Sequence, residues 1–378
     1  MKILLVFTFN TSLKIWHEQG ILTRELKVYK DLVDELNYEV SLLTYGNNDD
    51  INILEEYNLD NYFETIPIFS ILKKSKSKIV NIFKSIYFAY YLRKNNYIYD
   101  VVKTNQLYGS WLAILFKILA KNKLIIRTGY NPLVFAKHEG KSKVKILLYS
   151  VLTKIALIYA DTYITTNKDD MELITKKESL REKMVYQPNF VEVKNKNLNS
   201  IEKRINDTIF SVGRLEEQKN HIDLIKKLKD SRFKLKIIGE GILKEKLIKC
   251  AEKNNVDLEI SKNLKHELLL RTYSNYLFYI QISKYEGNPK TILEAMSAGC
   301  VVMVTDVYGV RNIVNHKKNG IILKNGENLS MVIDNLLNDK ELLNMLSKNA
   351  RFTVENNFSY QKYLETEKNN YRNLNIIN

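Results

Sequence analysis

Short apolar segments alternate with longer amphipathic segments along the first half of the chain. Residues 20–36, for example, have the spacing of an amphipathic helix and lie between two apolar runs. This strand, helix, strand rhythm predicts parallel strands joined by helices, and hence an α/β fold. Strands are expected at residues 2–9, 38–46, 99–104, 123–129 and 162–166. The alternation therefore predicts a Rossmann-like domain in residues 1–187.

A second alternation of the same kind follows a polar segment. Residues 185–207 are polar, contain Pro188 and lack a sustained periodicity, so we expect the linker between two domains there. A second Rossmann-like domain is expected at residues 188–358, and a last helix in residues 359–378. Strands of this domain are expected at residues 208–214, 233–241, 256–261, 277–283, 300–306 and 320–323. Length alone also favours two domains, because the chain has 378 residues.

The segment Tyr285–Cys300 has a pattern that suits a nucleotide-sugar site. It follows an apolar strand, and a helix should begin at Pro289 because proline is favoured in the first helical turn. The free amides of that turn attract phosphate, and carboxylates on either side of it can accept hydrogen bonds from hydroxyls. The alternative is a surface loop followed by an ordinary helix. The donor-binding residues expected here are Glu286, Gly287, Asn288, Pro289, Lys290, Thr291, Ile292 and Glu294.

Two further segments of the second half could contact a nucleotide. Gly213 and Arg214 end an expected strand, and Lys219 follows five residues after Arg214, so both cations could meet a diphosphate. A solvated charged loop is the alternative. Gly239 and Glu240 end the next strand, where backbone can approach a nucleotide base closely, although an ordinary strand-to-helix turn explains them as well.

At these residues the sequence resembles the retaining GT-B glycosyltransferases of family 4, the glycosyl transferases group 1. The resemblance implies two Rossmann-like domains that face a cleft, with the last helix crossing back onto the first domain. It implies that Glu286 contacts the transferred sugar, that Glu294 contacts the ribose, and that Arg214 and Lys219 stabilise the departing diphosphate. It also implies a nucleoside-diphosphate sugar donor of the UDP or GDP type, with no cofactor and no required metal.

The first domain departs from the pattern of this family. The segment after the first strand offers only Gly20 in place of a glycine pair, which leaves its contact with donor or acceptor open. Many relatives have a histidine after a central strand, where this chain has Arg127, Thr128 and Gly129. We expect Gly20, Arg127 and Gly129 on the acceptor side, with a structural ion pair as the alternative for Arg127.

Charge and hydropathy set the remaining expectations. The net charge is +15 and the pI is near 9.3, so anionic partners are expected, but no nucleic-acid-binding motif is present. Residues Ile71–Lys94 combine lysines with apolar residues at helical spacing, which fits either a helix on an anionic membrane or a core helix with solvated lysines. With no long apolar run and only two cysteines, we expect a cytoplasmic protein, attached at most peripherally to the inner face of the membrane.

These observations favour an enzyme over a binding protein. The predicted activity is transfer of a sugar from a nucleoside-diphosphate sugar to a glycan or lipid-linked acceptor in surface polysaccharide or glycolipid synthesis. Neither half contains GxGxxG after a strand, which argues against a dinucleotide oxidoreductase. A GT-B epimerase or phosphorylase, and an inactive membrane-associated scaffold, remain as alternatives.

Overall fold

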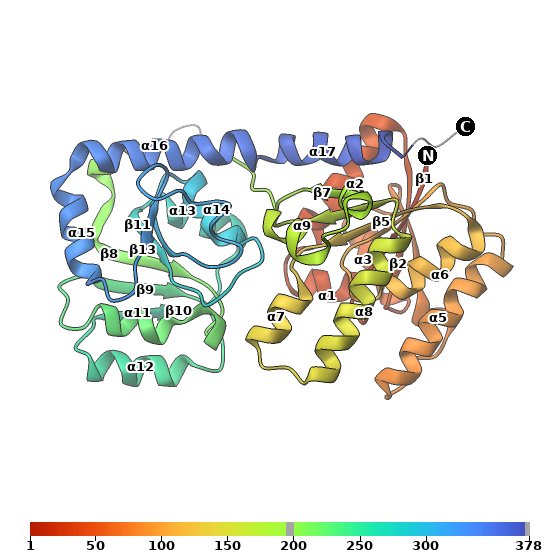
Figure 1. Ribbon diagram of the computed structural model, residues 1–378, viewed down its shortest axis with the longest axis horizontal. Coiled ribbons are helices and arrows are strands. Elements are labelled where there is room, and N and C mark those ends of the chain that lie inside the picture. The colour runs from red at the N-terminus through yellow and green to blue at the C-terminus, as the bar shows by residue number, and fades with distance from the viewer. Residues whose placement is uncertain (194–199, 375–378) are drawn as a thin grey trace. The chain divides into compact units, whose positions relative to one another are not determined.

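The computed structural model describes residues 1–193 and 200–374 of the chain. The described residues form two compact units (Figure 1). Unit 1 consists of Met1–Gln187 with Leu364–Asn378, and unit 2 consists of Pro188–Tyr363. Each unit contains one parallel sheet with helices, so the predicted α/β fold is confirmed.

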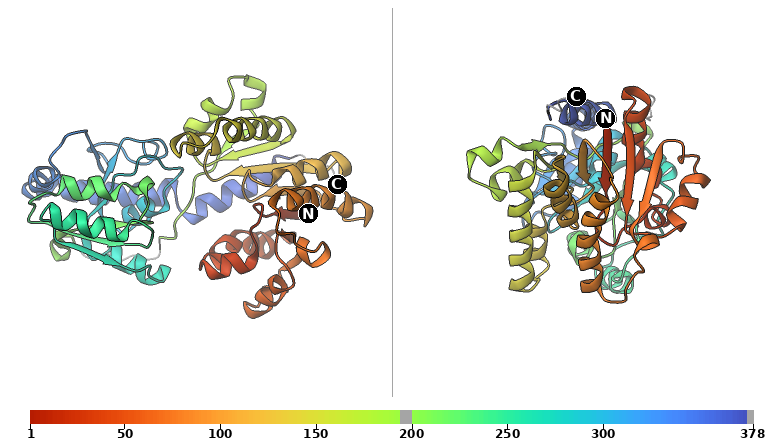
Figure 2. Two further views of the ribbon diagram at one scale, coloured as in Figure 1. Left: turned by 90° about the horizontal axis from the view of Figure 1, so that it is seen from below. Right: turned by 90° about the vertical axis from the view of Figure 1, so that its right-hand side faces the viewer.

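The sheet of unit 1 has seven parallel strands in the order β3-β2-β1-β4-β5-β6-β7. The strands are β1 Lys2–Val6, β2 Glu39–Thr44, β3 Phe63–Pro67, β4 Val101–Thr104, β5 Lys123–Thr128, β6 Thr162–Thr165 and β7 Met184–Tyr186. The central strands consist almost entirely of buried residues, as expected for a sheet covered on both faces. Helices lie on both sides of this sheet (Figure 2).

The helices of unit 1 connect these parallel strands. They are α1 Leu13–Glu18, α2 Leu22–Leu36, α3 Asp49–Glu56, α4 Ile68–Ile71, α5 Lys78–Lys94, α6 Ser110–Ala120, α7 Pro132–His138, α8 Lys143–Tyr159, α9 Lys168–Ile174 and α10 Glu178–Arg181. Because every paired strand runs the same way, a helix that connects two strands begins at the carboxyl edge of the sheet. The loops after β1, β4 and β5 lie at that edge.

Three details of unit 1 differ from the expectation. The first helix was expected at residues 20–36, but the segment before it contains α1, because Ser12 caps that helix by accepting a hydrogen bond from the amide of Ile15. The helix expected across Ile71–Lys94 begins only at Lys78, since the backbone at Leu72 and at Ser77 is extended. Strands β3 and β7 were not expected, and β7 occupies the start of the polar segment predicted as a linker.

Unit 2 contains a six-stranded parallel sheet in the order β10-β9-β8-β11-β12-β13. The strands are β8 Ile205–Val212, β9 Lys234–Ile238, β10 Leu258–Ser261, β11 Tyr276–Gln281, β12 Val301–Thr305 and β13 Ile321–Leu323. The helices are η1 Ile201–Lys203, η2 Glu217–Lys219, α11 His221–Lys227, α12 Lys244–Lys253, α13 His266–Tyr273, α14 Lys290–Ser297, α15 Leu329–Asn338 and α16 Lys340–Asn357. Two apolar clusters of buried side chains form the core of the unit.

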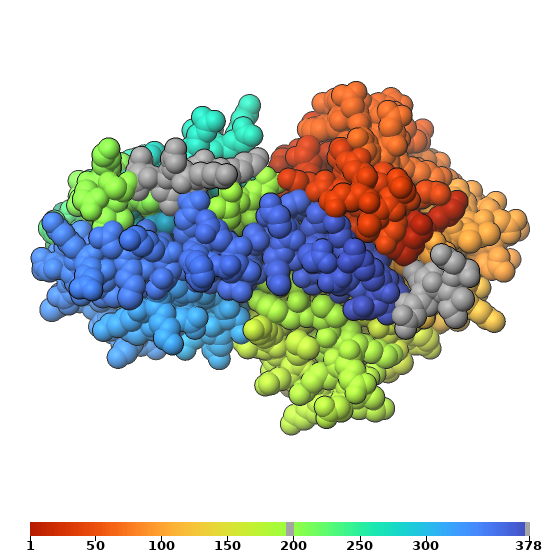
Figure 3. All heavy atoms as spheres, turned by 90° about the horizontal axis from the view of Figure 1, so that it is seen from above, coloured from red at the N-terminus to blue at the C-terminus, as the bar shows by residue number. Residues whose placement is uncertain are grey.

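The last helix, α17 Tyr360–Arg372, begins in unit 2 and ends in unit 1. One side of α17 lies on the surface in Figure 3, whereas Glu367 on the other side is fully buried. Glu367 forms an ion pair with the buried Lys103 of β4 and accepts a hydrogen bond from Gln187 at 3.0 Å. Burial by itself would raise the pKa of Glu367, but Lys103, Gln187 and Tyr371 hold that pKa below its usual value. A charged pair therefore attaches α17 to the sheet of unit 1.

Candidate active site

The segments of unit 2 predicted to bind the donor meet where the strand order reverses. β8 and β11 are neighbours in the sheet. After β8 the next strands, β9 and β10, lie on one side of this pair, and after β11 the next strands, β12 and β13, lie on the other side. In open parallel sheets, the crevice beyond the carboxyl ends of two such strands is the usual ligand site. Gly213 and Arg214 follow β8, and the loop with Glu286 follows β11, so the fold brings these two predicted segments together.

Glu286 lies at the centre of a buried cluster of polar side chains. Its side chain is 7% exposed, and its Oε1 accepts hydrogen bonds from Lys219 Nζ at 2.6 Å, Ser283 Oγ at 2.6 Å and Gln281 Nε2 at 2.8 Å. The Lys219 side chain is only 12% exposed. Such buried charges are stable only when they are paired and hydrogen-bonded, as they are here. Two residues predicted to contact the donor are thus in direct contact with each other.

Gln281 links this cluster to the start of α14. Its Oε1 accepts hydrogen bonds from Thr291 Oγ1 at 2.7 Å and from Tyr279 OH at 2.8 Å, while its Nε2 donates to Ser283 and Glu286. α14 begins at Lys290 with Pro289 as its N-cap residue, close to the start predicted from the sequence. The first amides of a helix have no partner inside the helix and can bind an anion. Gln281 therefore fixes Glu286 relative to that helix end.

Glu294 lies in the middle of α14 and is 5% exposed. Its Oε1 lies 3.1 Å from His266 Nε2, at the start of α13, and its Oε2 accepts a hydrogen bond from Tyr273 OH at 3.3 Å. Burial, together with the charge of Glu294, raises the pKa of Tyr273, so its hydroxyl stays protonated and can donate. The carboxylate of Glu294 is thus oriented by two groups of α13.

The loop that holds Arg214 and Lys219 packs very closely against the loop after β9. A Cβ atom built on Gly239 would lie 1.9 Å from the carbonyl oxygen of Gly213, so only glycine fits at position 239. Arg214 is exposed and donates to Glu216 and Gln218 at 3.1 Å each, so it is not part of the Glu286 cluster. Glu240 is exposed and accepts a hydrogen bond from Asn263 at 3.0 Å.

The remaining predicted residues of unit 2 shape the loop before α14. Asn288 is buried and accepts two hydrogen bonds from Asn189, at its side chain (3.0 Å) and at its carbonyl (2.8 Å). Ile292 is fully buried in the core, and Lys290 Nζ lies 5.8 Å from the centre of the Phe190 ring. A Cβ atom on Gly309 would lie 2.4 Å from the carbonyl oxygen of Gly287, which leaves no room for a side chain at position 309.

Within unit 1, the three residues predicted on the acceptor side are not grouped. Gly20 lies on the exposed turn between α1 and α2, with a φ of +65°. Arg127 is 9% exposed and close enough to Lys103 to affect its pKa, so it lies near the buried ion pair with Glu367. Gly129 follows β5, where its amide donates to Gln106 Oε1 at 2.7 Å and its carbonyl accepts from Thr166.

A small pocket of about 90 Å³ lies at the carboxyl edge of the unit 1 sheet. The residues that line it come from the loops after β1, β4 and β5 and from α7 and α8, and most are apolar or aromatic. They are Thr8, Gln106, Leu107, Tyr108, Tyr130, Pro132, Tyr149 and Leu152. Gln106, the partner of Gly129, is one of them, so Gly129 lies beside this pocket.

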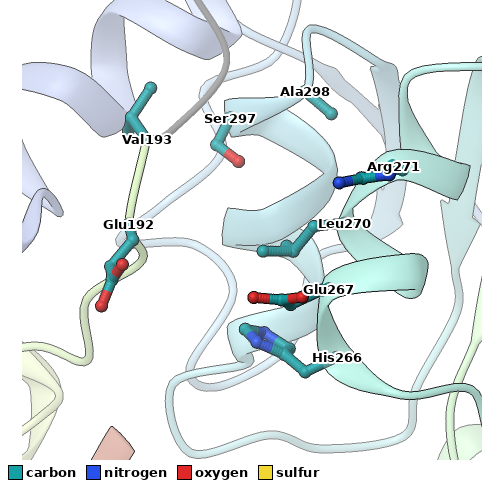
Figure 4. Close-up of a pocket in the computed structure, with 8 residues that line it drawn as sticks. All are labelled: Glu192, Val193, His266, Glu267, Leu270, Arg271, Ser297 and Ala298. Atoms are coloured by element: carbon teal, nitrogen blue, oxygen red, sulfur yellow. The ribbon is translucent and has the colours of Figure 1, made fainter.

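A second pocket, of about 150 Å³, lies in unit 2 between α13, α14 and residues 192–193 (Figure 4). His266 lines it, and the same side chain contacts Glu294. None of the predicted donor-binding residues lines this pocket. Among the described residues, no three histidine, cysteine, aspartate or glutamate side chains are grouped where they could hold a metal ion.

Sequence reasoning missed four residues that contact the predicted carboxylates: Gln281, Ser283, His266 and Tyr273. The sequence did contain a signal for Gln281. Its side chain is the one amide in β11, whose other side chains are apolar or aromatic, and a buried amide requires hydrogen-bond partners. His266 had no such signal, since it precedes Glu294 by 28 residues and belongs to no motif.

Comparison with known proteins shows what this chain is similar to. Residues 194–353 match the family model described as Glycosyl transferases group 1. An uncharacterized glycosyltransferase of Methanocaldococcus jannaschii is 30% identical over 209 residues, which are 51% of this chain and 50% of that protein. The chain thus spans about half the length of this relative. The UDP-Gal:alpha-D-GlcNAc-diphosphoundecaprenol alpha-1,3-galactosyltransferase of Escherichia coli is 27% identical over 322 residues, 76% of this chain and 79% of that protein.

A solved structure extends the likeness to both units. The crystal structure of Anabaena HepE in complex with UDP and glucose aligns with a TM-score of 0.73 at 14% identity, and the alignment covers 99% of this chain and 100% of that chain. The two parallel sheets of seven and six strands thus form a GT-B fold.

Proposed function

We propose that this chain, of which residues 194–353 match the family model of the glycosyl transferases group 1, transfers a sugar from a nucleoside-diphosphate sugar to a glycan or lipid-linked acceptor. One observation carries the proposal. Glu286 and Lys219 form a buried ion pair beyond the carboxyl ends of β8 and β11, next to the first turn of α14. A cation, a carboxylate and a helix N-terminus at one point suit a ligand that has both phosphates and hydroxyls.

The donor contacts follow from these positions. The diphosphate binds to the first amides of α14 and to Lys219, and Arg214 turns from Glu216 toward it. Within the described part of the chain, no hydrogen bond reaches Oε2 of Glu286, so this oxygen is available to a hydroxyl of the transferred sugar. Glu294, oriented by His266 and Tyr273, accepts hydrogen bonds from the ribose. We propose a donor of the UDP or GDP type, and the complex of HepE with UDP and glucose supports the former.

The proposed reaction retains the anomeric configuration and uses no metal. The acceptor oxygen forms a bond to the anomeric carbon while the bond from that carbon to the diphosphate breaks, on the same face of the sugar. The proton of the acceptor hydroxyl passes to the leaving diphosphate, since none of the side chains that donate hydrogen bonds to Glu286 (Lys219, Gln281 and Ser283) is a carboxylate or a histidine. Arg214 and Lys219 stabilise the negative charge that develops on the diphosphate.

The acceptor is proposed from the relatives. The Escherichia coli relative is named for a diphosphoundecaprenol acceptor, and a Campylobacter jejuni relative, 26% identical over 265 residues, is named for another. We propose the same class of acceptor here, used in surface polysaccharide or glycolipid synthesis on the cytoplasmic side of the membrane. The segment Ile71–Lys94 then lies near an anionic lipid surface. No helix among the described residues has the length and hydropathy needed to cross a bilayer.

The first experiment measures nucleotide binding through thermal stability. UDP, GDP, ADP, CDP and dTDP are added separately to the full chain, and the shift of the unfolding midpoint is recorded. A nucleotide at about 100 times its dissociation constant adds about 2.7 kcal/mol to the unfolding free energy, which shifts the midpoint by a few degrees. Glu294→Gln and Lys219→Met should each lose this shift, because each removes a proposed donor contact.

Two comparisons make that experiment specific. Lys249→Met, on the exposed face of α12, removes a lysine to which no donor contact is assigned and should keep the full shift. Transfer of labelled sugar to a diphosphoundecaprenol acceptor should continue in EDTA, and loss of transfer that manganese restores would reject the metal-free mechanism. Isomerised donor, or sugar released only with added phosphate, would instead indicate the epimerase or phosphorylase alternatives.

A further inference from the structure

α8 has an apolar face that the fold does not bury. Only Thr153, Ala156 and Leu157 of its 17 residues are buried. Six large apolar side chains on the helix are between 39% and 66% exposed: Val144, Leu147, Leu148, Val151, Ile155 and Ile158. Exposed apolar residues scattered singly are ordinary, but a continuous helical stripe of this size marks a binding surface.

α5 repeats this arrangement. Phe83 and Ile79 are each 66% exposed, and Tyr87 and Tyr90 are about half exposed. Both helices belong to one layer of unit 1, because α6 packs against α5 through the hydrogen bond from Trp111 to Ser85 and also contacts α8. Figures 1 and 2 show the N-terminal ends of α5 and α8 at the same end of unit 1. We call the exposed sides of these two helices, with the lysines beside them, the α5–α8 face.

The charge of the α5–α8 face has one sign. Residues 65–99 contain seven lysines or arginines and no carboxylate side chain, and residues 140–160 contain four lysines and no carboxylate side chain. Lys143 and Lys145 lie in the first turn of α8, beside Val144 and Leu147, and both are exposed. Apolar residues flanked by lysines suit a bilayer surface, because the side chains enter the headgroup region while the ammonium groups meet anionic lipids.

The α5–α8 face adjoins the predicted acceptor side of unit 1. α8 connects β5 to β6, so its N-terminal half extends from the carboxyl edge of the sheet. Tyr149 and Leu152 of α8 also line the pocket of about 90 Å³ at that edge, beside Gln106 and Gly129. One helix thus has an exposed apolar side next to an apolar pocket on the predicted acceptor side.

We propose that the α5–α8 face docks unit 1 on an anionic lipid bilayer, with α8 as the principal contact, and that lipid-linked acceptors enter the pocket beside Tyr149 from that bilayer. The role in acceptor delivery rests on the proposed function, whereas the docking itself does not. A second copy of the chain is a poorer occupant of this face. A symmetric contact would place the lysines of both copies against each other without a carboxylate between them.

The test measures binding of the full chain to sedimented vesicles. One set contains phosphatidylcholine alone, and the other contains phosphatidylcholine mixed with phosphatidylglycerol. The protein should bind the anionic vesicles, and binding should weaken as salt is added. Lys143→Glu combined with Lys145→Glu should weaken binding roughly tenfold or more, since each lysine near the surface contributes about 1 kcal/mol. Leu147→Ser combined with Leu148→Ser should weaken binding to a similar extent.

Matched variants in unit 2 separate this effect from a general change of charge or hydropathy. Lys244→Glu combined with Lys249→Glu, on α12, changes the net charge equally and should keep binding, as should Phe352→Ser, which removes an apolar side chain that is 66% exposed. Circular dichroism and thermal unfolding confirm that each variant folds.

Several outcomes would overturn the docking proposal: no binding, equal binding to both kinds of vesicle, equal losses in the α12 variant, or a dimer in sedimentation that the α8 variants abolish. Nucleotide-dependent stabilisation is measured on the same proteins, so that the docking proposal and the proposed function are tested independently. Vesicle binding without any nucleotide response would reject the proposed function and leave the docking surface standing.

Discussion

Gly239 and Gly213 show how closely the backbone of the candidate site is packed. The Cβ of an alanine at position 239 would lie 1.9 Å from the Gly213 carbonyl oxygen, and that oxygen belongs to backbone that cannot rotate away. The strand ends would have to separate, and the segment that leads to Lys219 would move with Gly213. At single residues, the site thus depends on the absence of side chains as much as on charged groups.

Gly239→Ala should therefore destabilise unit 2 by about 1–3 kcal/mol, the usual cost of overpacking. It should also abolish nucleotide-dependent stabilisation, because Lys219 is displaced. Gly326→Ala is the control for the nucleotide response: a Cβ there would meet nothing within 4 Å, so the variant should lose only the roughly 1–2 kcal/mol of backbone strain at its φ of +81° and keep nucleotide-dependent stabilisation. A Gly239→Ala variant with the stability and nucleotide response of the parent would contradict the close approach.

His221, two residues after Lys219, links stability to pH. It is 4% exposed, and burial together with the charge of Lys219 lowers its pKa from 6.5 to about 4. The unfolded chain binds a proton at this histidine as pH falls below about 6.5, whereas the folded chain does not until pH approaches 4. The free energy of unfolding therefore falls as pH decreases from about 6.5 toward 4. Above pH 6.5 this contribution of His221 is absent.

Urea unfolding at several pH values tests this linkage. Between pH 7 and pH 4.5, the parent should lose about 2 kcal/mol more unfolding free energy than His221→Gln, which cannot take up that proton. The exposed His138→Gln serves as a comparison and should follow the parent. Parallel pH profiles for the parent and His221→Gln would show that His221 titrates normally in the folded chain.

At the residue scale, the sequence predicted which segments come together but not the contacts between their side chains. Glu286 and Lys219 were predicted from two separate segments, and strand order brings them within 2.6 Å. Their direct pairing was not predictable, because it depends on η2 and on hydrogen bonds across 67 residues of sequence. The roles of His266 and Tyr273 were hidden for the same reason: their contacts with Glu294 arise only once α13 packs against α14.

At the scale of elements, α17 shows how a helix end can be fixed by charge. Glu367 pairs with Lys103 at a site where both side chains are 0% exposed, and Lys103 Nζ lies 5.3 Å from the Tyr29 ring and 5.7 Å from the Tyr371 ring. Two charges without contact to water are stable only together, since either one alone keeps its full cost of leaving water.

Glu367→Gln should consequently destabilise unit 1 by about 3–5 kcal/mol, because Lys103 is left buried without its counter-charge. Lys103→Met combined with Glu367→Gln should recover part of that loss, which a double-mutant cycle in urea measures. Lys368→Ala removes the partly exposed pair of the same helix with Glu35 and should cost about 1 kcal/mol or less. Equal losses for Glu367→Gln and Lys368→Ala would contradict a special role for the buried pair.

Elements with a strong pattern were predicted well, and short ones were not. β5, β11 and α2 have long apolar or amphipathic runs, and the predicted positions agree within a few residues. β7 has only three residues and lies in a polar segment, so nothing local distinguishes it from a linker. α1 has six residues and depends on the Ser12 cap, and a segment this short is a weak sequence signal for a helix.

At the scale of the whole molecule, the two units can be observed separately. The chain contains two tryptophans, Trp16 and Trp111, and both lie in unit 1. Trp16 is buried against Phe7, and Trp111 donates a hydrogen bond to Ser85. Tryptophan fluorescence therefore reports the unfolding of unit 1, whereas calorimetry records both units.

If the nucleotide binds in unit 2, it should raise the calorimetric transition of that unit more than the transition detected by tryptophan fluorescence. The Lys219→Met variant should show no difference with and without nucleotide. Equal shifts by both methods in the parent would mean that the units unfold together or that the nucleotide also contacts unit 1.

The alternation of strands and helices was sufficient to predict both sheets, because each expected helix joins neighbouring or nearby parallel strands. The net charge of +15 was less informative, since composition cannot distinguish a phosphorylated substrate from a lipid surface. The proposed lipid contact rests on the exposed fractions of α5 and α8, which appear only when packing has decided which apolar residues are buried.

The path of α17 also determines the order in which the chain can fold as it is synthesised. Unit 1 includes residues on both sides of unit 2 in the sequence, so all of Pro188–Tyr363 leaves the ribosome before Glu367 can reach Lys103. Until then, Lys103 lacks its counter-charge, and the sheet around β4 cannot close over it. Unit 2 can therefore reach its final fold first, although it comes second in the sequence.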